Sequence, residues 1–365
     1  MSASSESAPP ASRIAVGMSG GLDSSVVAAM LREQGHDVIG LTLHLFKEGS
    51  RCCSIEDIQR ARRICDLLDI PHASINLVDE FEETIIRPFI EAYATGRTPS
   101  PCVLCNEYIK FGALQERAMQ LGCSHVATGH YVRLEQRPDG WHLFRARDAK
   151  KDQSYFLHRL SQAQLARSLF PLAGWSKPEV AAYAEENKLP VSVSSKDESQ
   201  DLCFLTDAGH VPFVEKYRPE LRTAGAILSS SGQRLGTHEG IHRFTVGQRK
   251  GIGVAAPERL YVKALDPAEN RVIVGRRDEV FSSSLDIEAM HWISGTPPPL
   301  PFACSVRVRY RHEAARCRIE PAAEGRLRAR LDEPQFAVTP GQAAVLYDGD
   351  EVLGGGWIAT TEGTA

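Results

Sequence analysis

Hydrophobic positions in the first half of the chain alternate between short buried runs and helical periodicity. The run 14–16 predicts a strand, and residues 24–34 place Val26 and Met30 on one helical face. The alternation continues through strands at 38–43, 73–77 and 125–128 and helices at 55–68 and 81–95. This order predicts a parallel sheet with helices on both faces, and ligands beyond the carboxyl ends of its strands.

Beyond about residue 207 the helical periodicity gives way to short β-branched runs between Gly, Pro and Asn turns. These runs lie at 225–228, 259–264, 271–275, 304–310, 326–331, 336–338, 343–347 and 355–358. We therefore expect an α/β protein with an N-terminal doubly wound parallel sheet, a small β-rich central domain and a C-terminal β-barrel. The expected parts are a disordered tail over 1–12, an α/β domain over 13–207, a central domain over 208–280 and a barrel over 281–365.

Composition restricts the class of protein without identifying it. The chain has 365 residues, of which 42% are hydrophobic and 24% charged, as in a protein with folded cores. No apolar run is long enough to cross a bilayer, and the first twelve residues contain no Lys or Arg. We expect a cytoplasmic protein that makes no membrane contact. Nine cysteines are too few for a disulfide scaffold and favour thiol chemistry in a reducing compartment.

The charge is unevenly distributed. The net charge of −4 argues against a nucleic-acid partner, yet residues 241–277 and 305–330 each carry eight basic against three acidic residues. Strand periodicity would place Arg307, Arg309 and Arg311 on one face. Taken alone, this pattern is more typical of a solvated strand face than of a docking surface.

A Gly-rich string, Gly17–Ser24, connects the first predicted strand to its helix. Its backbone N–H groups and helix start suit phosphate, and it is not a Walker A loop. The Ser-Gly-Gly-x-Asp-Ser pattern resembles the loop of the PP-loop ATP pyrophosphatases. The resemblance implies that ATP adenylates an oxygen of the substrate, that this loop holds the pyrophosphate, and that Mg²⁺ sits near Asp23.

Two cysteine motifs carry the remaining candidate chemistry. Cys102 and Cys105 form a CxxC, which by itself is half a zinc site or a redox pair. A helix opening at Asn106 would lower the pKa of a neighbouring thiol. Cys203, taken alone, is more typical of a small buried residue.

Together these strings resemble one family, the bacterial-type tRNA-uridine 2-sulfurtransferases (2-thiouridylases, MnmA). The likeness extends from Ile14 to Ile358 and includes the strings 98–111, 127–131, 148–156, 199–204, 247–251, 307–311, 338–342 and 354–358. It implies an enzyme that replaces O2 of the wobble uridine (position 34) of tRNA with sulfur. ATP adenylates that oxygen, AMP and pyrophosphate leave, and 2-thiouridine forms.

The resemblance also implies roles for individual residues. Positions matching the ATP site are Gly17, Met18, Ser19, Gly20, Gly21, Leu22, Asp23, Ser24, Leu43 and Gly129. Positions matching tRNA contacts are Ser100, Pro101, Cys102, His130, Lys151, Asp152, Gln153, Arg309, Tyr310 and Gln342. The catalytic pair matches Cys203, which carries the persulfide, and Cys105, which frees the sulfur and leaves a Cys105–Cys203 disulfide.

Cys102 departs from the family pattern, in which many members have Asp. Three thiols at Cys102, Cys105 and Cys203 could instead hold an iron–sulfur cluster, which stays an alternative to the persulfide route. Two other classes remain open: another PP-loop enzyme, or a metal-stabilised tRNA-binding module without catalysis.

The resemblance implies several partners. They are tRNAs of the Lys, Glu and Gln types and a sulfur donor such as a cysteine desulfurase or a sulfur-relay protein. We expect a monomer. Among the other cysteines, packing is the expected role of Cys52, Cys53 and Cys65, and thiolation should tolerate alanine at Cys123, Cys304 and Cys317.

Overall fold

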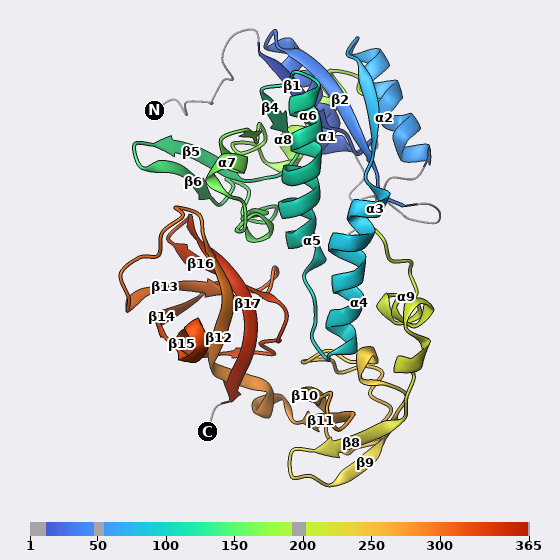
Figure 1. The fold of residues 1–365 in the computed structure, drawn as a ribbon, viewed down its shortest axis with the longest axis vertical. Coiled ribbons are helices and arrows are strands. Elements are labelled where there is room, and N and C mark those ends of the chain that lie inside the picture. The colour runs from blue at the N-terminus through green and yellow to red at the C-terminus, as the bar shows by residue number, and fades with distance from the viewer. Residues whose placement is uncertain (1–11, 47–54, 192–201, 364–365) are drawn as a thin grey trace.

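The computed structural model describes residues 12–46, 55–191 and 202–363, which form three parts (Figure 1). The N-terminal part is built on a five-stranded sheet of order β3-β2-β1-β4-β7, in which every neighbouring pair is parallel. Its strands are β1 (Arg13–Gly17), β2 (Asp37–His44), β3 (His72–Asn76), β4 (His125–Ala127) and β7 (Ser168–Leu169). The predicted parallel sheet is confirmed. Cys52, Cys53 and most of the expected tail lie outside the described residues.

Helices cover both faces of this sheet because successive residues of β1 point in opposite directions. Ile14 and Val16 pack with α1 (Leu22–Glu33), α2 (Ile55–Leu67) and α8 (Lys177–Glu186). Ala15 packs on the other face with α6 (Leu114–Gln120). None of the helices in the described ranges has the length and apolar character needed to cross a membrane.

Two long helical segments run from the sheet toward the other parts (Figure 1). One combines α3 (Val78–Phe81), the π-helix η1 (Glu82–Ile86) and α4 (Arg87–Ala94). The other combines α5 (Pro101–Leu104), the π-helix η2 (Cys105–Ala113) and α6. The shorter helices are η3 (Ser154–Phe156), α7 (Gln162–Leu165), α9 (His210–Tyr217), η5 (Pro219–Leu221), η6 (Ile241–Arg243), η7 (Arg277–Val280) and η8 (Ala323–Gly325).

The central part is a four-stranded sheet of order β10-β11-β8-β9. Its strands are β8 (Gly225–Ser229), β9 (Arg234–His238), β10 (Tyr261–Asp266) and β11 (Arg271–Gly275). Only the β11–β8 pairing among them is parallel. Val262, Val272 and Val274 form the centre of its own small core.

The C-terminal part is a closed antiparallel barrel, because β12 pairs with both β15 and β17. Its strands are β12 (Phe281–Trp292), β13 (Phe302–Arg307), β14 (Ala315–Pro321), β15 (Leu327–Phe336), β16 (Ala343–Asp348) and β17 (Glu351–Gly363). The hairpin of β5 (Arg133–Arg137) and β6 (Gly140–Phe144) leaves the N-terminal part and pairs with β17. The predicted barrel is confirmed, and this hairpin joins it to the α/β part.

One strand prediction was too long. The expected run 304–310 ends as a strand at Arg307, and residues 308–312 form bends and turns. The expectation that Arg307, Arg309 and Arg311 share one strand face was therefore wrong. Arg307 and Arg309 are directed into contacts between the parts of the molecule, and Arg311 is exposed.

Candidate active site

The Gly-rich loop lies at the carboxyl end of β1, where the parallel sheet was expected to bind its ligand. The Met18 N–H donates to the Leu41 carbonyl at 2.8 Å, which fixes the loop to β2. Gly20 has φ +74°, and a Cβ there would approach the Asp57 carbonyl oxygen to 2.9 Å. Gly21 is the N-cap of α1 and supplies no side-chain cap. The first-turn N–H groups of α1 are therefore not taken by a side-chain cap, as an anion site requires.

Gly129 follows β4 and lies directly against the start of α1. A Cβ at this position would meet the Asp23 Cβ at 2.7 Å and the Ser24 N at 3.1 Å. Any larger residue would displace the start of α1, which forms part of the predicted phosphate site. Leu43 lies near the end of β2 and packs against the apolar clusters on that side of the sheet.

Asp23 is held by two residues that the sequence analysis did not identify. Lys177 Nζ lies 2.9 Å from each carboxylate oxygen, and the Tyr131 hydroxyl donates to Oδ1 at 2.8 Å. With these partners Asp23 does not fit the role of a metal ligand in this arrangement. The Ser176–Glu179 capping box begins α8 and is readable from sequence, but the approach of Lys177 to Asp23 is a tertiary contact.

Replacing Lys177 by methionine is expected to weaken ATP binding about tenfold while leaving the fold intact. Without the ammonium group, the Asp23 carboxylate faces the triphosphate uncompensated. The check is ATP affinity by titration calorimetry, with Lys177→Arg as the charge-conserving control. Equal affinity of Lys177→Met and the unchanged protein would exclude a role for Lys177 at the phosphates.

Two of the three candidate thiols pack near the ends of β2 and β3. Cys105 and Cys203 are partly buried against one apolar cluster, which includes Phe81, Phe204 and Leu205 and also contacts Leu43. Cys102 is exposed near the start of α5. Two cysteines that are far apart in sequence thus pack against the same apolar cluster.

The expected lowering of the Cys105 pKa was wrong. The helix begins at Pro101, one turn before Cys105, and Cys105 opens the π-helix η2 inside it. Burial raises the pKa of the Cys105 thiol, and the charge of Lys110 opposes that rise only in part. The resting thiol is therefore mainly protonated at neutral pH.

Alkylation of Cys105 is expected to accelerate about tenfold per pH unit across neutral pH, because only the thiolate reacts. Lys110→Met removes the cation that favours the thiolate, so the profile should move to higher pH; Lys110→Arg should leave it in place. The measurement is iodoacetamide labelling of Cys105 followed by peptide mass spectrometry. A profile unchanged in Lys110→Met would contradict this electrostatic account.

The loop that precedes the CxxC is held by the C-terminal barrel. Gln342 Nε2 donates to the carbonyl oxygens of Thr98 and Pro99 at 3.1 and 3.0 Å, and the Thr98 N–H donates to Pro340 O at 2.9 Å. Gln342 therefore positions the loop that leads into Ser100.

Several predicted tRNA-contact residues gather around Tyr155 and Phe156. The Tyr155 hydroxyl donates to Ala343 O at 2.9 Å, and the Ser100 side chain also hydrogen-bonds to this phenol. The Tyr310 ring packs against Phe156 with ring centroids 4.4 Å apart and the ring planes tilted by 41°. Segments from the α/β part and the barrel therefore pack together at this point.

Asp152 is almost fully buried and is satisfied within the protein. It accepts hydrogen bonds from Ala146 N, Ser154 N and Ser154 Oγ, and it forms an ion pair with Arg307 at 3.1 Å. Its side chain connects the α/β part to the barrel. Lys151, beside it, is half-buried.

Gln153 links these segments to the Gly17–Ser24 loop through Tyr131. Its Oε1 accepts from the Tyr131 N–H at 3.0 Å and its own N–H donates to Tyr131 O at 2.9 Å. Tyr131 in turn binds Asp23, so one tyrosine connects both predicted sites. His130 is buried beside them, and burial and the Lys110 charge hold its pKa well below 6.5, which keeps it neutral.

Arg309 joins the barrel to the central part. Its guanidinium donates to Val246 O at 2.9 Å and to the Thr339 hydroxyl at 2.5 Å. Burial lowers its pKa. The side chain predicted to contact tRNA is thus engaged between two parts of the protein.

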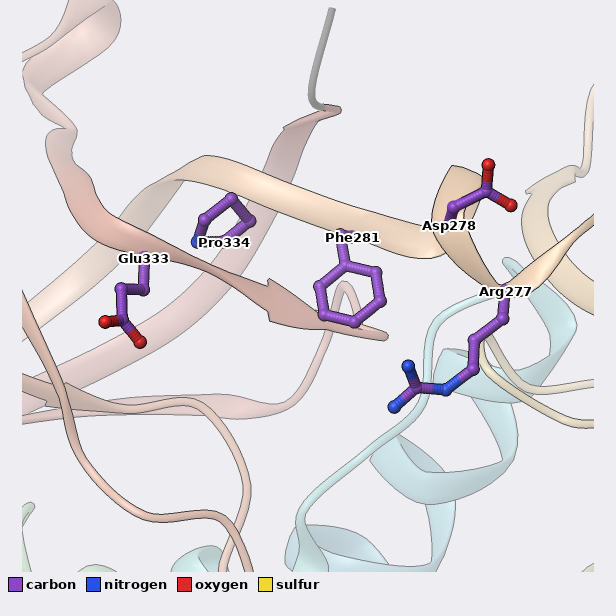
Figure 2. A pocket seen from close by; sticks show the side chains of 5 residues that line it. All are labelled: Arg277, Asp278, Phe281, Glu333 and Pro334. Carbon is purple, nitrogen blue, oxygen red and sulfur yellow. The ribbon is translucent and has the colours of Figure 1, made fainter.

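An open depression lies where η7, β12 and β15 meet (Figure 2). It has a volume of about 660 Å³ and is lined by Arg277, Asp278, Phe281, Glu333 and Pro334. The Arg277 guanidinium lies over the rings of Phe281 and Phe336 at 5.2 and 5.1 Å. None of the predicted ATP or tRNA positions lines it.

The thiols do not form a metal site in this arrangement. Within residues 12–46, 55–191 and 202–363, no three His, Cys, Asp or Glu side chains come together as a metal-binding group. Cys102, Cys105 and Cys203 therefore do not fit an iron–sulfur cluster here.

Three family models match the chain in succession. They are described as the tRNA methyl transferase HUP domain (residues 12–207), the tRNA methyl transferase PRC-barrel domain (212–276) and the aminomethyltransferase beta-barrel domain (282–358). Among curated proteins, the chain is 47% identical to the tRNA-specific 2-thiouridylase MnmA of Geotalea uraniireducens, covering 95% of this chain and 94% of the relative. The proteins of that name from Acidobacterium capsulatum and Solibacter usitatus are 46% and 45% identical; these matches cover 94% and 96% of this chain and 98% and 100% of the relatives.

Proposed function

The chain belongs to the tRNA-specific 2-thiouridylase family, and on that premise we propose that it replaces O2 of the wobble uridine of tRNA with sulfur at the expense of ATP. The observation that carries the proposal is the arrangement of two sites. The Tyr131–Gln153 link joins the Asp23 loop to the segment that contains Tyr155, and Cys105 and Cys203 pack against one apolar cluster.

The proposed reaction has two stages. The uridine O2 attacks the α-phosphorus of ATP; pyrophosphate leaves toward the N–H groups of the Gly17–Ser24 loop, with Mg²⁺ carried by the phosphates. The terminal sulfur of a Cys203 persulfide then attacks C2, and AMP departs with the former O2. AMP is a far better leaving group than a carbonyl oxygen, and for this reason the uridine is adenylated before sulfur attacks.

The last step frees the product. The Cys105 thiolate attacks Cys203 Sγ, the S–S bond to the uridine sulfur breaks, and 2-thiouridine leaves with both electrons of that bond. A Cys105–Cys203 disulfide remains, and an external thiol or a fresh persulfide donor must reduce it. The apolar surroundings of Cys105 support this order, because a mainly protonated thiol is protected from oxidation until substrate arrives.

We propose that tRNA docks on the central part as well. Arg249, Lys250 and Arg259 are exposed there, whereas Arg243 and Arg271 form ion pairs with Glu215 and Glu269. Exposed guanidinium and ammonium groups are the side chains that bind backbone phosphate.

Arg249→Ala combined with Lys250→Ala is expected to weaken tRNA binding and to reduce its salt dependence. Losing two phosphate contacts should lower the slope of log affinity against log salt by about 1.5. Filter binding across a salt series measures this slope. The matched control is Arg271→Ala, which removes a cation already paired with Glu269; an equal change in that variant would argue against a local docking surface.

Methyl transfer to tRNA is the second candidate function, since two of the matching family models are described as domains of a tRNA methyl transferase. The cysteine pair and the loop for a phosphate leaving group favour sulfur transfer. The iron–sulfur alternative is testable by iron and sulfide analysis after anaerobic purification, where a stoichiometric cluster required for activity would exclude Cys203 as a persulfide carrier.

The remaining proposals concern the substrates, the sulfur donor, the oligomeric state and the location of the protein. We propose tRNAs of the Lys, Glu and Gln types as substrates, a cysteine desulfurase or relay protein as sulfur donor, a monomeric state and a cytoplasmic location. The direct test of the function is pyrophosphate release from ATP with and without unmodified tRNA, followed by nucleoside mass spectrometry for 2-thiouridine. Pyrophosphate release that does not depend on tRNA, or a methylated product, would exclude the proposed reaction.

A further inference from the structure

Two cysteines outside the proposed active site face each other inside the barrel. Cys304 on β13 and Cys317 on β14 are direct cross-strand partners in the antiparallel ladder. Their Sγ atoms are 3.6 Å apart, and both are free thiols. Opposed positions in an antiparallel pair have Cβ atoms about 4.5–5.5 Å apart, near the range of a disulfide, so a short movement of both side chains is enough for bonding.

The two thiols differ in exposure. Cys317 is 3% exposed and packs in the barrel core with Val306 and Ile319. Cys304 is half-buried at the margin of this core, so a small oxidant can reach it first. The adjoining Cys304 thiol and burial both raise the pKa of Cys317, which agrees with direct contact between the groups.

We propose that Cys304 and Cys317 form a redox-active dithiol that a hydroperoxide closes to a cross-strand disulfide. The Cys304 sulfur attacks the peroxide oxygen, the O–O bond breaks, and a sulfenic acid and water (or an alcohol) form. The Cys317 sulfur then attacks the sulfenic sulfur, and the hydroxyl leaves as water with the thiol proton. The two thiols lose two electrons in total, and the peroxide gains them.

The bond would fix the β13–β14 hairpin. The segment between the strands begins after Arg307, which binds Asp152, and contains Arg309, which binds Val246 O. A disulfide between these two cysteines, which are 13 positions apart in sequence, therefore restrains the connection that joins the barrel to both other parts. This modification site is independent of the proposed thiolation, because neither cysteine lies in the Cys105–Cys203 cluster.

The test is peptide mapping of the full-length protein after hydrogen peroxide treatment and blocking of free thiols. Trypsin cuts after Arg277, Arg307, Arg316 and Arg318, so the bond would join peptide 278–307 to the dipeptide Cys317–Arg318. We expect this linked species in oxidised protein, its loss on reduction, and an unfolding midpoint at least about 3 °C higher in the oxidised form.

Two variants complete the experiment. Cys304→Ser and Cys317→Ala should each lose the linked peptide and the oxidation-dependent thermal shift, while the reduced forms retain tRNA binding. Conversion of Cys304 to sulfinic acid without the linked peptide would overturn the proposal. So would a linked peptide that forms only in denatured protein, because folded proximity would then play no part.

Discussion

Cys105→Ser is expected to stop thiolation at a covalent protein–tRNA adduct. The Cys203 persulfide still attacks C2 and releases AMP, but no second thiol is present to break the S–S bond to the uridine. Turnover should fall by more than about a thousandfold, because serine cannot resolve a disulfide at neutral pH. The adduct is measured as a shifted band on a non-reducing gel, and dithiothreitol should release it as 2-thiouridine-containing tRNA.

Cys203→Ser is the matched variant for this experiment. It should form no adduct and no 2-thiouridine, while pyrophosphate release with tRNA continues, since adenylation precedes sulfur transfer. Cys123→Ser, at a buried position between α6 and β4, should behave as the unchanged protein. An adduct that forms in Cys203→Ser would reverse the assigned roles of the two cysteines.

Asp152→Ala is expected to destabilise the protein by about 3–5 kcal/mol rather than simply to remove a tRNA contact. The change leaves Arg307, only 15% exposed at its side chain, without the carboxylate that compensates it. It also removes the acceptor of three further hydrogen bonds. The measurement is the free energy of unfolding from chemical denaturation, compared with Lys150→Ala at an exposed neighbouring position.

A double-mutant cycle separates the ion pair from the rest of the network. The double variant Asp152→Asn/Arg307→Met should lose less free energy of unfolding than the two single variants lose together. The reason is that Arg307→Met removes the charge that Asp152→Asn leaves uncompensated. Additive costs would show that Asp152 and Arg307 are not energetically coupled. Normal stability with weakened tRNA binding in Asp152→Ala would instead favour a direct tRNA contact.

The local sequence was sufficient for α1 and the first strands of the sheet because the forces that form single helices and strands act over short distances. The periodicity of Val26 and Met30 placed α1 within two residues, and the strand at 38–43 matches β2. Glycines in the sequence also marked close contacts of the chain, since a Cβ at Gly20 or Gly129 would come too close to a neighbouring residue. The error at 304–310 arose because β-branched alternation predicts extended chain but not the contacts at which a strand ends.

The sequence by itself determined the fold class and the order of the three parts, and it supplied the candidate anion-binding loop and the candidate cysteines, because periodicity, turn chemistry and motif spacing are local properties. Only the tertiary structure decided the partners of these residues. It paired Asp23 with Lys177, buried Asp152 against Arg307, raised rather than lowered the Cys105 pKa, and set Cys304 opposite Cys317. Each of these outcomes depends on burial and on contacts between segments that are distant in sequence. Strand register and packing create these contacts, and a local sequence pattern contains no information about them.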